Sequence, residues 1–272
     1  MIERKIPSTG ELIPVIGLGT WQSFDVSASS NLSPLQQVLS EMNNAGGKLI
    51  DSSPMYGRSE EIIGLLTANA PTDQYFFATK VWTHGKEEGI RQMENSFRKF
   101  KRSVIDLVQV HNLVDWKTHF KTLRKWKEEG RIRYIGITHY TDSMHNELSK
   151  IIRSEKPDFV QFNYSITDRH AEKILLPTAK DYSVATLINR PFGEGSLFKK
   201  VKGKKLPSWA GEYGIENWGG FFLKFIISNP AVTCVIPATS NPAHAKDNFN
   251  SGVEPLPDET MRQRMVEWMD TI

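Results

Sequence analysis

The chain has 272 residues, of which 39% are hydrophobic and 24% charged, and its formal net charge is +3. This composition is typical of an ordinary folded protein and excludes intrinsic disorder. The small positive surplus is spread along the chain, whereas nucleic-acid binding needs a concentrated basic face, so no nucleic-acid partner is expected. The single cysteine, Cys234, excludes an intramolecular disulfide and fits a reducing compartment.

The N-terminal segment lacks the features of a secretory leader, because charges, prolines and glycines interrupt it. No stretch of the chain approaches the ~18 consecutive apolar residues of a membrane span. We therefore expect a cytoplasmic protein with no membrane partner, present as a monomer or a weak homo-oligomer.

Short apolar runs alternate with amphipathic segments along the whole chain. The apolar runs lie at 15–21, 48–53, 75–82, 104–112, 134–140, 159–165, 184–192 and 232–240. Each is apolar on both faces in its first half, which is typical of a parallel strand covered on both sides. Helices are predicted at 33–45, 59–68, 87–101, 118–129, 143–154 (capped by Asp142), 169–182, 217–229, 242–250 and 258–270.

Eight strand-helix units without a break in composition predict a (β/α)8 TIM barrel as a single domain over residues 1–272, ending in C-terminal helices. An open doubly wound sheet is the alternative, but Gly17 and Gly19 lack the third glycine of its fingerprint. The segments around Ser8 to Gly10 predict an N-terminal β-hairpin that plugs the bottom of the barrel. The stretch 193–216 is predicted to be a long irregular loop on the catalytic face.

Polar residues fall at or just after the carboxyl ends of predicted strands, where barrel enzymes build their active sites. They are Asp51, Tyr56, Lys80 and His111. Hydride addition to a carbonyl leaves an alkoxide that must be protonated as it forms. Tyr56 is the predicted proton donor, with Lys80 lowering its pKa and Asp51 keeping Lys80 charged. His111 is expected to orient the substrate oxygen.

Seven segments together resemble the aldo-keto reductase family, over Ile16 to about Asn248: IGLGTW, GGKLIDSSPMYGRSE, FFATKVW, LVQVHN, YIGITHY, QFNYS and IPATSNPAHAKDN. The resemblance implies an NAD(P)H-dependent oxidoreductase that reduces aldehydes and ketones to alcohols. It implies a catalytic tetrad of Asp51, Tyr56, Lys80 and His111, with Tyr56 as general acid.

The resemblance also implies a cofactor site. Its residues at the nicotinamide end are Thr20, Trp21, Asp51, Thr138, His139 and Gln161. After the seventh strand they are Asn189, Arg190, Pro191, Phe192 and Gly193, and at the adenosine end they are Thr239, Ser240, His244 and Asn248. Arg190 is expected at the pyrophosphate, with an ion pair to Glu194 as the alternative.

The chain departs from the family pattern at both ends of this site. Asn189 stands where members often carry a stacking aromatic, and Ala238 and His244 stand where NADPH-preferring members carry cations. The basic segment 199–205 either restores positive potential there or is a solvated loop. NADP(H) is expected in preference to NAD(H), because members of the family commonly use NADP(H). Use of NADH, or of both cofactors, remains the alternative.

The substrate pocket is predicted to contain Trp21, Trp82, His111 and Asn112, whose aromatic walls suit a small apolar or aryl carbonyl compound.

One alternative function is a nucleotide-binding redox-sensing or regulatory subunit on the same fold. Another is a metal-dependent hydrolase that uses Asp51, His84, His111 and His139. The chain lacks the His-x-His and His-Glu-x-x-His motifs of such enzymes, so no metal is expected.

Overall fold

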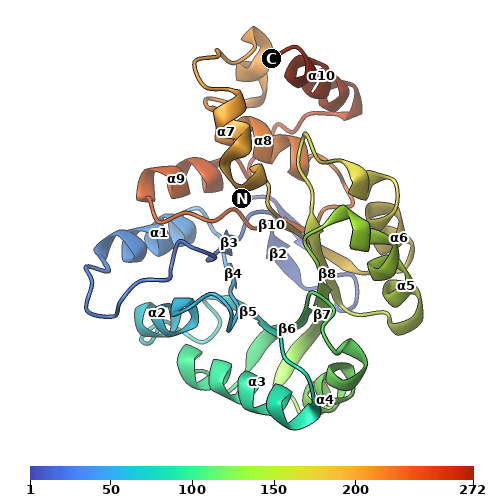
Figure 1. The fold of residues 1–272 in the computed structure, drawn as a ribbon. Helices are drawn as coiled ribbons and strands as arrows, with labels where there is room; N and C mark the ends of the chain where they lie inside the picture. Colours follow the sequence, from blue (N-terminus) through green and yellow to red (C-terminus); the bar gives the residue numbers. More distant parts are fainter.

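The computed structural model describes residues 1–272 and shows a barrel of strands surrounded by helices (Figure 1). Eight parallel strands form the wall, each hydrogen-bonded to the next in chain order. They are β3 (Leu18–Gly19), β4 (Leu49–Asp51), β5 (Phe76–Val81), β6 (Ile105–His111), β7 (Ile132–Thr138), β8 (Phe159–Asn163), β9 (Ala185–Asn189) and β10 (Cys234–Val235). The predicted (β/α)8 barrel is confirmed.

Contacts between the segments around β3 and β10 close the barrel. The Gly17 amide donates to the Val235 carbonyl at 2.9 Å, and the Gly19 amide donates to the Pro237 carbonyl at 3.0 Å. A Cβ at Gly19 would lie only 2.7 Å from the carbonyl oxygen of Ile236, so a side chain here would hold the two segments apart. The two glycines therefore serve barrel closure, and the doubly wound alternative is excluded.

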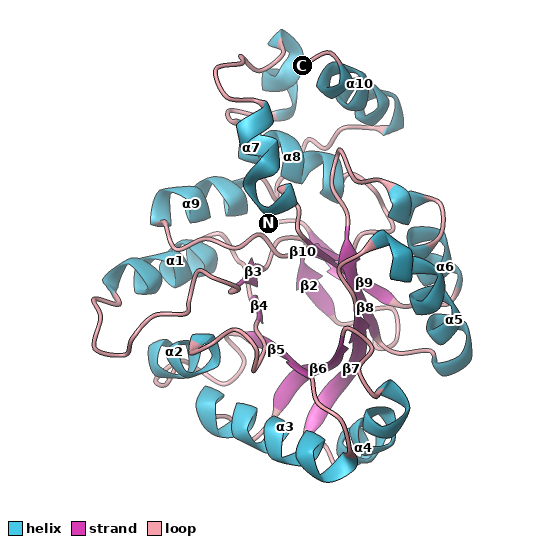
Figure 2. Cartoon of the chain, in the orientation of Figure 1, coloured by secondary structure: helices cyan, strands magenta, loops and turns pink.

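Helices cover the outside of the barrel (Figure 2). They are α1 (Ser33–Asn44), α2 (Ser59–Leu66), α3 (Lys86–Phe100), α4 (Trp116–Glu128), α5 (His145–Glu155), α6 (Leu175–Asp181), α7 (Ser196–Lys200), α8 (Trp218–Ile227), α9 (Pro242–Asn250) and α10 (Glu259–Asp270). In α3, Met93, Phe97 and Phe100 form the buried stripe that the helical period predicts. No helix combines the length and the apolar character that crossing a membrane requires.

Two predicted segments differ from the structure. The single helix predicted at 169–182 is a 3-10 turn, η2 (His170–Glu172), followed by α6. Pro177 in the first turn of α6 has no amide N–H and a fixed φ, so a helix can begin just before it but cannot run through it. The stretch 193–216 is not irregular, because it holds α7 and two 3-10 turns, η3 (Gly193–Gly195) and η4 (Ser208–Tyr213). Buried apolar side chains, among them Trp209, anchor this stretch to the core.

The predicted cap of α5 is also wrong. The helix begins at His145, its N-cap is Met144, and no side chain caps it. Asp142 instead opens a 3-10 turn, η1 (Asp142–Met144), and accepts a hydrogen bond from Asn163. A tertiary partner has therefore taken the carboxylate that local sequence assigned to the helix end.

An antiparallel hairpin, β1 (Glu3–Lys5) and β2 (Leu12–Pro14), covers the N-terminal end of the barrel. Ile6 and Ile13 belong to one buried cluster with residues at the N-terminal ends of the strands, among them Leu49, Phe76 and Phe159. The predicted bottom plug is thus confirmed, and a site must lie at the opposite end.

Candidate active site

A pocket of about 790 Å³ lies at the carboxyl ends of the strands, where barrel enzymes carry their active sites. The predicted residues that line it are Thr20, Trp21, Asp51, Tyr56, Trp82, His111, Asn112, Thr138, Gln161, Asn189, Arg190, Pro191, Phe192, Thr239, Ser240 and His244. The predicted residues that do not line it are Lys80, His139, Gly193 and Asn248. The barrel thus gathers most of the candidate site from eight separate strand ends.

Lys80 is fully buried beneath the pocket. Its Nζ donates to Asp51 Oδ2 at 2.6 Å and to the Ser52 carbonyl oxygen at 2.8 Å. Burial alone would lower the pKa of Lys80, but the Asp51 carboxylate and the Tyr56 hydroxyl outweigh burial, so the pKa lies above its ordinary value. The ammonium is therefore charged at neutral pH, as the sequence predicted.

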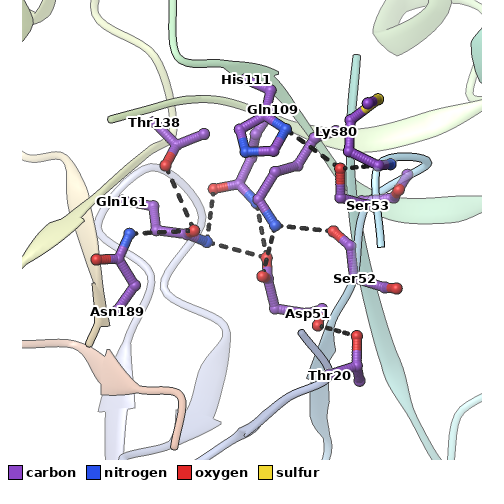
Figure 3. A network of polar contacts seen from close by, with 12 residues as sticks. Thr20, Asp51, Ser52, Ser53, Lys80, Gln109, His111, Thr138, Gln161 and Asn189 are labelled. Atoms are coloured by element: carbon purple, nitrogen blue, oxygen red, sulfur yellow. Dashed lines mark hydrogen bonds and ion pairs between the residues drawn. The ribbon is translucent and has the colours of Figure 1, made fainter. Parts of the chain in front are cut away.

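Asp51 is held by two amides as well as by Lys80 (Figure 3). Its Oδ1 accepts from Gln109 Nε2 and from Gln161 Nε2, both at 2.9 Å. Three donors on one carboxylate compensate for its removal from water. Gln109 was not predicted as a site residue, although it lies two residues before His111 and so on the same face of β6. That alternation is the signal that would have identified it.

Gln161 already uses both polar atoms of its side-chain amide within the protein, since its Nε2 donates to Asp51 Oδ1 and, at 3.2 Å, to Gln109 Oε1. Its Oε1 accepts from Thr138 Oγ1 at 3.3 Å and from Asn189 Nδ2 at 3.5 Å. Asn189 Oδ1 is buried and has no hydrogen-bond partner. Buried polar atoms are normally paired, so this orphan acceptor calls for a donor from a bound molecule. The hydroxyl and the two amides together fit the carboxamide of a nicotinamide ring.

Tyr56 lies over the buried ion pair. Lys80 Nζ is 4.8 Å from the centre of the Tyr56 ring. Burial raises the pKa of the Tyr56 hydroxyl; Lys80 opposes that rise, but the Asp51 charge adds to it, and the net pKa lies above its ordinary value. Lys80 thus acts on this pKa in the expected direction, but burial, which is the largest effect, and the Asp51 charge outweigh it, so the expected net lowering does not occur. Tyr56 is protonated at neutral pH, which is the state that a proton donor needs.

His111 faces Tyr56 with ring centres 6.0 Å apart and nearly perpendicular planes. Its Nδ1 is 3.2 Å from Ser53 Oγ, which also accepts from the Met55 amide at 3.2 Å. A hydroxyl has one hydrogen and two lone pairs, so Ser53 Oγ can accept from the Met55 amide and also donate to Nδ1, and that arrangement places the imidazole proton on Nε2. Burial, followed by the charge of Lys80, lowers the pKa of His111 to about 3. His111 is therefore a neutral donor.

Arg190 follows the alternative that the sequence left open. It pairs with Glu194 at 2.8 Å, and its guanidinium carbon lies 4.2 Å from the centre of the Tyr140 ring. Contact with a pyrophosphate would compete with Glu194 for the same guanidinium. Tyr140, which was not among the predicted site residues, also lines the pocket.

The adenosine end of the predicted cofactor site has few charged side chains. Ala238, Thr239, Ser240 and His244 line it, and no lysine or arginine does. It lies at the N-terminus of α9, where the Asn241 side chain accepts from the Ala243 amide at 2.9 Å. A helix N-terminus favours an anion, although without the strength of a paired cation.

Three predicted cofactor residues lie outside the pocket for local reasons. His139 turns its Nδ1 back to the amides of Tyr140 and Thr141, at 3.0 and 3.3 Å. Gly193 opens the η3 turn, and Asn248 is buried on the inner side of α9.

Comparison with known proteins places this arrangement in a family. The model of the Aldo/keto reductase family matches residues 15–265. The chain is 28% identical over 215 residues to aldo-keto reductase YhdN of Bacillus subtilis, covering 72% of this chain and 63% of that protein. It is 27% identical over 241 residues to the NADH-specific methylglyoxal reductase of Escherichia coli, covering 76% of this chain and 73% of that protein.

A solved structure shows the same fold. The aldo-keto reductase from Klebsiella pneumoniae in complex with NADPH superposes with a TM-score of 0.81 and 20% identity, over 99% of this chain and 96% of that one. The match of the family model extends over most of the residues described above, including all four tetrad positions. The chain therefore belongs to the aldo/keto reductase family, a family of oxidoreductases.

Proposed function

We propose that the protein reduces aldehydes and ketones to alcohols with a nicotinamide dinucleotide, and that Tyr56 is the general acid. The observation that carries this proposal is the buried Lys80–Asp51 pair directly beneath the Tyr56 ring at the floor of the pocket. Burying two charges is costly, and the same volume filled with apolar groups is often at least as stable. A charge pair placed under a pocket hydroxyl is better explained by chemistry than by stability.

The surrounding side chains have complementary roles. A reduced nicotinamide held by Thr138, Gln161 and Asn189 would supply the hydride. The Tyr56 hydroxyl gives its proton to the carbonyl oxygen, and the charged Lys80 stabilises the phenolate that remains. His111, neutral and with its proton on Nε2, donates a hydrogen bond that orients the same oxygen.

We propose NADP(H) as the preferred cofactor and NAD(H) as the second candidate. The Klebsiella pneumoniae structure contains NADPH, whereas the Escherichia coli relative is named NADH-specific. The N-terminus of α9 supports a 2′-phosphate, while Ala238 and the exposed His244 support NAD(H). A Michaelis constant for NADH tenfold below that for NADPH would reverse the choice.

Small aldehydes with an apolar or aryl group are the proposed substrates. Trp21, Met55 and Trp82 line the pocket and are each about two-fifths exposed, at 43%, 44% and 38%. These side chains form an apolar rim around the polar floor, and this combination holds an apolar substrate while fixing its carbonyl.

The test is turnover of an aromatic aldehyde and of methylglyoxal, followed by the absorbance of NADPH or NADH. We expect turnover that falls by about 10³-fold or more in Tyr56→Phe, while that variant still binds the nucleotide. Tyr164→Phe is the matched control, because it removes another buried hydroxyl, bonded to Glu172 and Arg262 outside the pocket. Nucleotide binding without turnover in the wild-type protein would favour the redox-sensing or regulatory alternative.

A further inference from the structure

Two loops on the pocket side of the barrel bring a second set of polar side chains together. Asp142 and His145 follow β7, two and five residues after the pocket-lining Tyr140, and His170 follows β8. Asp142, His145 and His170 each have a potential ligand atom within 4.8 Å of the other two. None of them has a part in the proposed reaction.

Asn163, at the end of β8, fixes where the protons lie in this cluster. Its Nδ2 donates to Asp142 Oδ1 and to Asp168 Oδ2, both at 2.6 Å. An amide nitrogen can only donate, so it faces the two carboxylate oxygens, and Asn163 Oδ1 faces His145 Nε2, 3.0 Å away. His145 therefore carries its proton on Nε2, and its Nδ1 is a lone pair.

That lone pair is directed at the other histidine. His145 Nδ1 is 2.9 Å from His170 Nδ1. Two imidazole nitrogens this close share either a proton or a cation. Nitrogens bound to one tetrahedral Zn²⁺ at 2.0–2.1 Å lie roughly 3.3 Å apart, so the two histidines need to move by only a few tenths of an ångström, while the Asp142 oxygen, within 4.8 Å of both, must move inward to complete the site.

The negative charge of the cluster is poorly compensated. Asp142 and Asp168 share the one Asn163 amide group, and Asp168 Oδ1 is buried without any hydrogen-bond partner. Neither carboxylate has an ion pair with a lysine or an arginine, and His145, whose Nε2 is 3.7 Å from Asp142 Oδ1, is a neutral imidazole when its Nδ1 is a lone pair. Two carboxylates that share one amide group carry negative charge that a cation bound at Asp142 would offset.

We propose that Asp142, His145 and His170 bind one divalent cation of the Zn²⁺ type. Imidazole nitrogens with a carboxylate suit Zn²⁺, whereas Mg²⁺ and Ca²⁺ prefer oxygen ligands alone. The hydrogen bond from His145 to Asn163 is the outer contact that orients a ligating imidazole, and Asp168 holds Asn163 in turn. The cation ties the loop that carries Tyr140 to the loop after β8.

The test uses the full chain without an affinity tag, freed of metal with a chelator. Titration with Zn²⁺ in a calorimeter is expected to show one site per chain, and Co²⁺ is expected to give the visible absorption of a low-coordinate site. Thermal unfolding at about a hundredfold excess of Zn²⁺ over its Kd is expected to shift Tm upward by about 5 °C.

Variants locate the site. His170→Gln and Asp142→Asn change partly exposed side chains and are each expected to weaken Zn²⁺ binding at least tenfold and to abolish the Co²⁺ spectrum. His84→Gln, which removes an exposed histidine outside the cluster, should leave both unchanged. An absence of saturable binding, or equal binding by all three variants, would show that the two histidines share only a proton. Because metal binding is measured directly, either result leaves the proposed reductase function untouched.

Discussion

The two ends of the pocket are built on different principles. At the pocket floor beneath Tyr56, Lys80 and Asp51 are almost completely buried, and both oxygens of the Asp51 carboxylate accept hydrogen bonds. At the adenosine end, Ala238 and Ser240 are exposed and His244 carries the only imidazole. Fixed charges in a dry place stabilise a transition state, whereas an exposed, nearly uncharged wall can only bind. Substitutions at the first end should therefore change rates, and substitutions at the second should change cofactor affinity.

The largest effect is expected from Lys80→Met. Turnover should fall by about 10³-fold, because the phenolate of Tyr56 loses its stabilising charge. The free energy of unfolding should fall by about 3–5 kcal/mol, because Asp51 is left buried without its counter-ion. Steady-state kinetics and denaturant unfolding measure the two effects separately.

Lys224→Met is the matched control for Lys80→Met. Lys224 is also buried, but its Nζ donates to the carbonyls of Val253 and Pro255, away from the pocket. Its loss should lower stability and leave turnover of the folded protein within about twofold. Equal losses of turnover in the two variants would mean that Lys80 acts only through stability, and the contrast between the two ends would fail.

A tenfold effect is expected at the other end. In Ala238→Arg, the Michaelis constant for NADPH should fall about tenfold while kcat changes little, because a charge-assisted hydrogen bond to a phosphate contributes about 1.5–3 kcal/mol. The constant for NADH should not change. Ala238→Gln, of similar length and no charge, separates charge from size. A change in kcat larger than the change in the Michaelis constant would contradict the assignment of cofactor affinity, and not rate, to this end of the pocket.

A smaller effect is expected at Ser53, which sets the tautomer of His111. Ser53→Ala should lower kcat about fivefold, the value of one neutral hydrogen bond, without changing cofactor affinity. The neighbouring Ser52→Ala is the control, because the buried Ser52 Oγ has no hydrogen-bond partner. Unchanged kcat in Ser53→Ala would show that packing against Tyr56 and Trp82 is enough to orient the imidazole.

The sequence predicted the barrel and the tetrad because both depend on local patterns. Strand runs, helix periods and the spacing from Asp51 to Tyr56 can be read within short windows. Gln109 and Asn163 were not predicted as site residues, because a single amide side chain in a strand forms no recognisable motif. In the fold, each donates a hydrogen bond to a carboxylate.

The remaining errors have a common physical origin. Asp142 was assigned to a helix cap because a cap is a local partner, whereas its actual donor, Asn163, lies 21 residues away. The pKa of Tyr56 was expected to fall because Lys80 was considered without burial and without the opposing charge of Asp51. Burial and partners distant in sequence are properties of the folded chain, so local patterns do not report them.

The central claim is that Tyr56, protonated at neutral pH beside a neutral His111, donates the proton. The pH dependence of kcat/KM for aldehyde reduction tests it most directly, because the donor must be protonated to act. Burial lowers the pKa of His111 to about 3 and raises that of Tyr56 above its ordinary value. We predict a rate that varies less than about threefold from about pH 5 to about pH 9 and falls only as Tyr56 ionises at higher pH. A rate that falls with a midpoint between about pH 6 and about pH 8 would contradict the assignment.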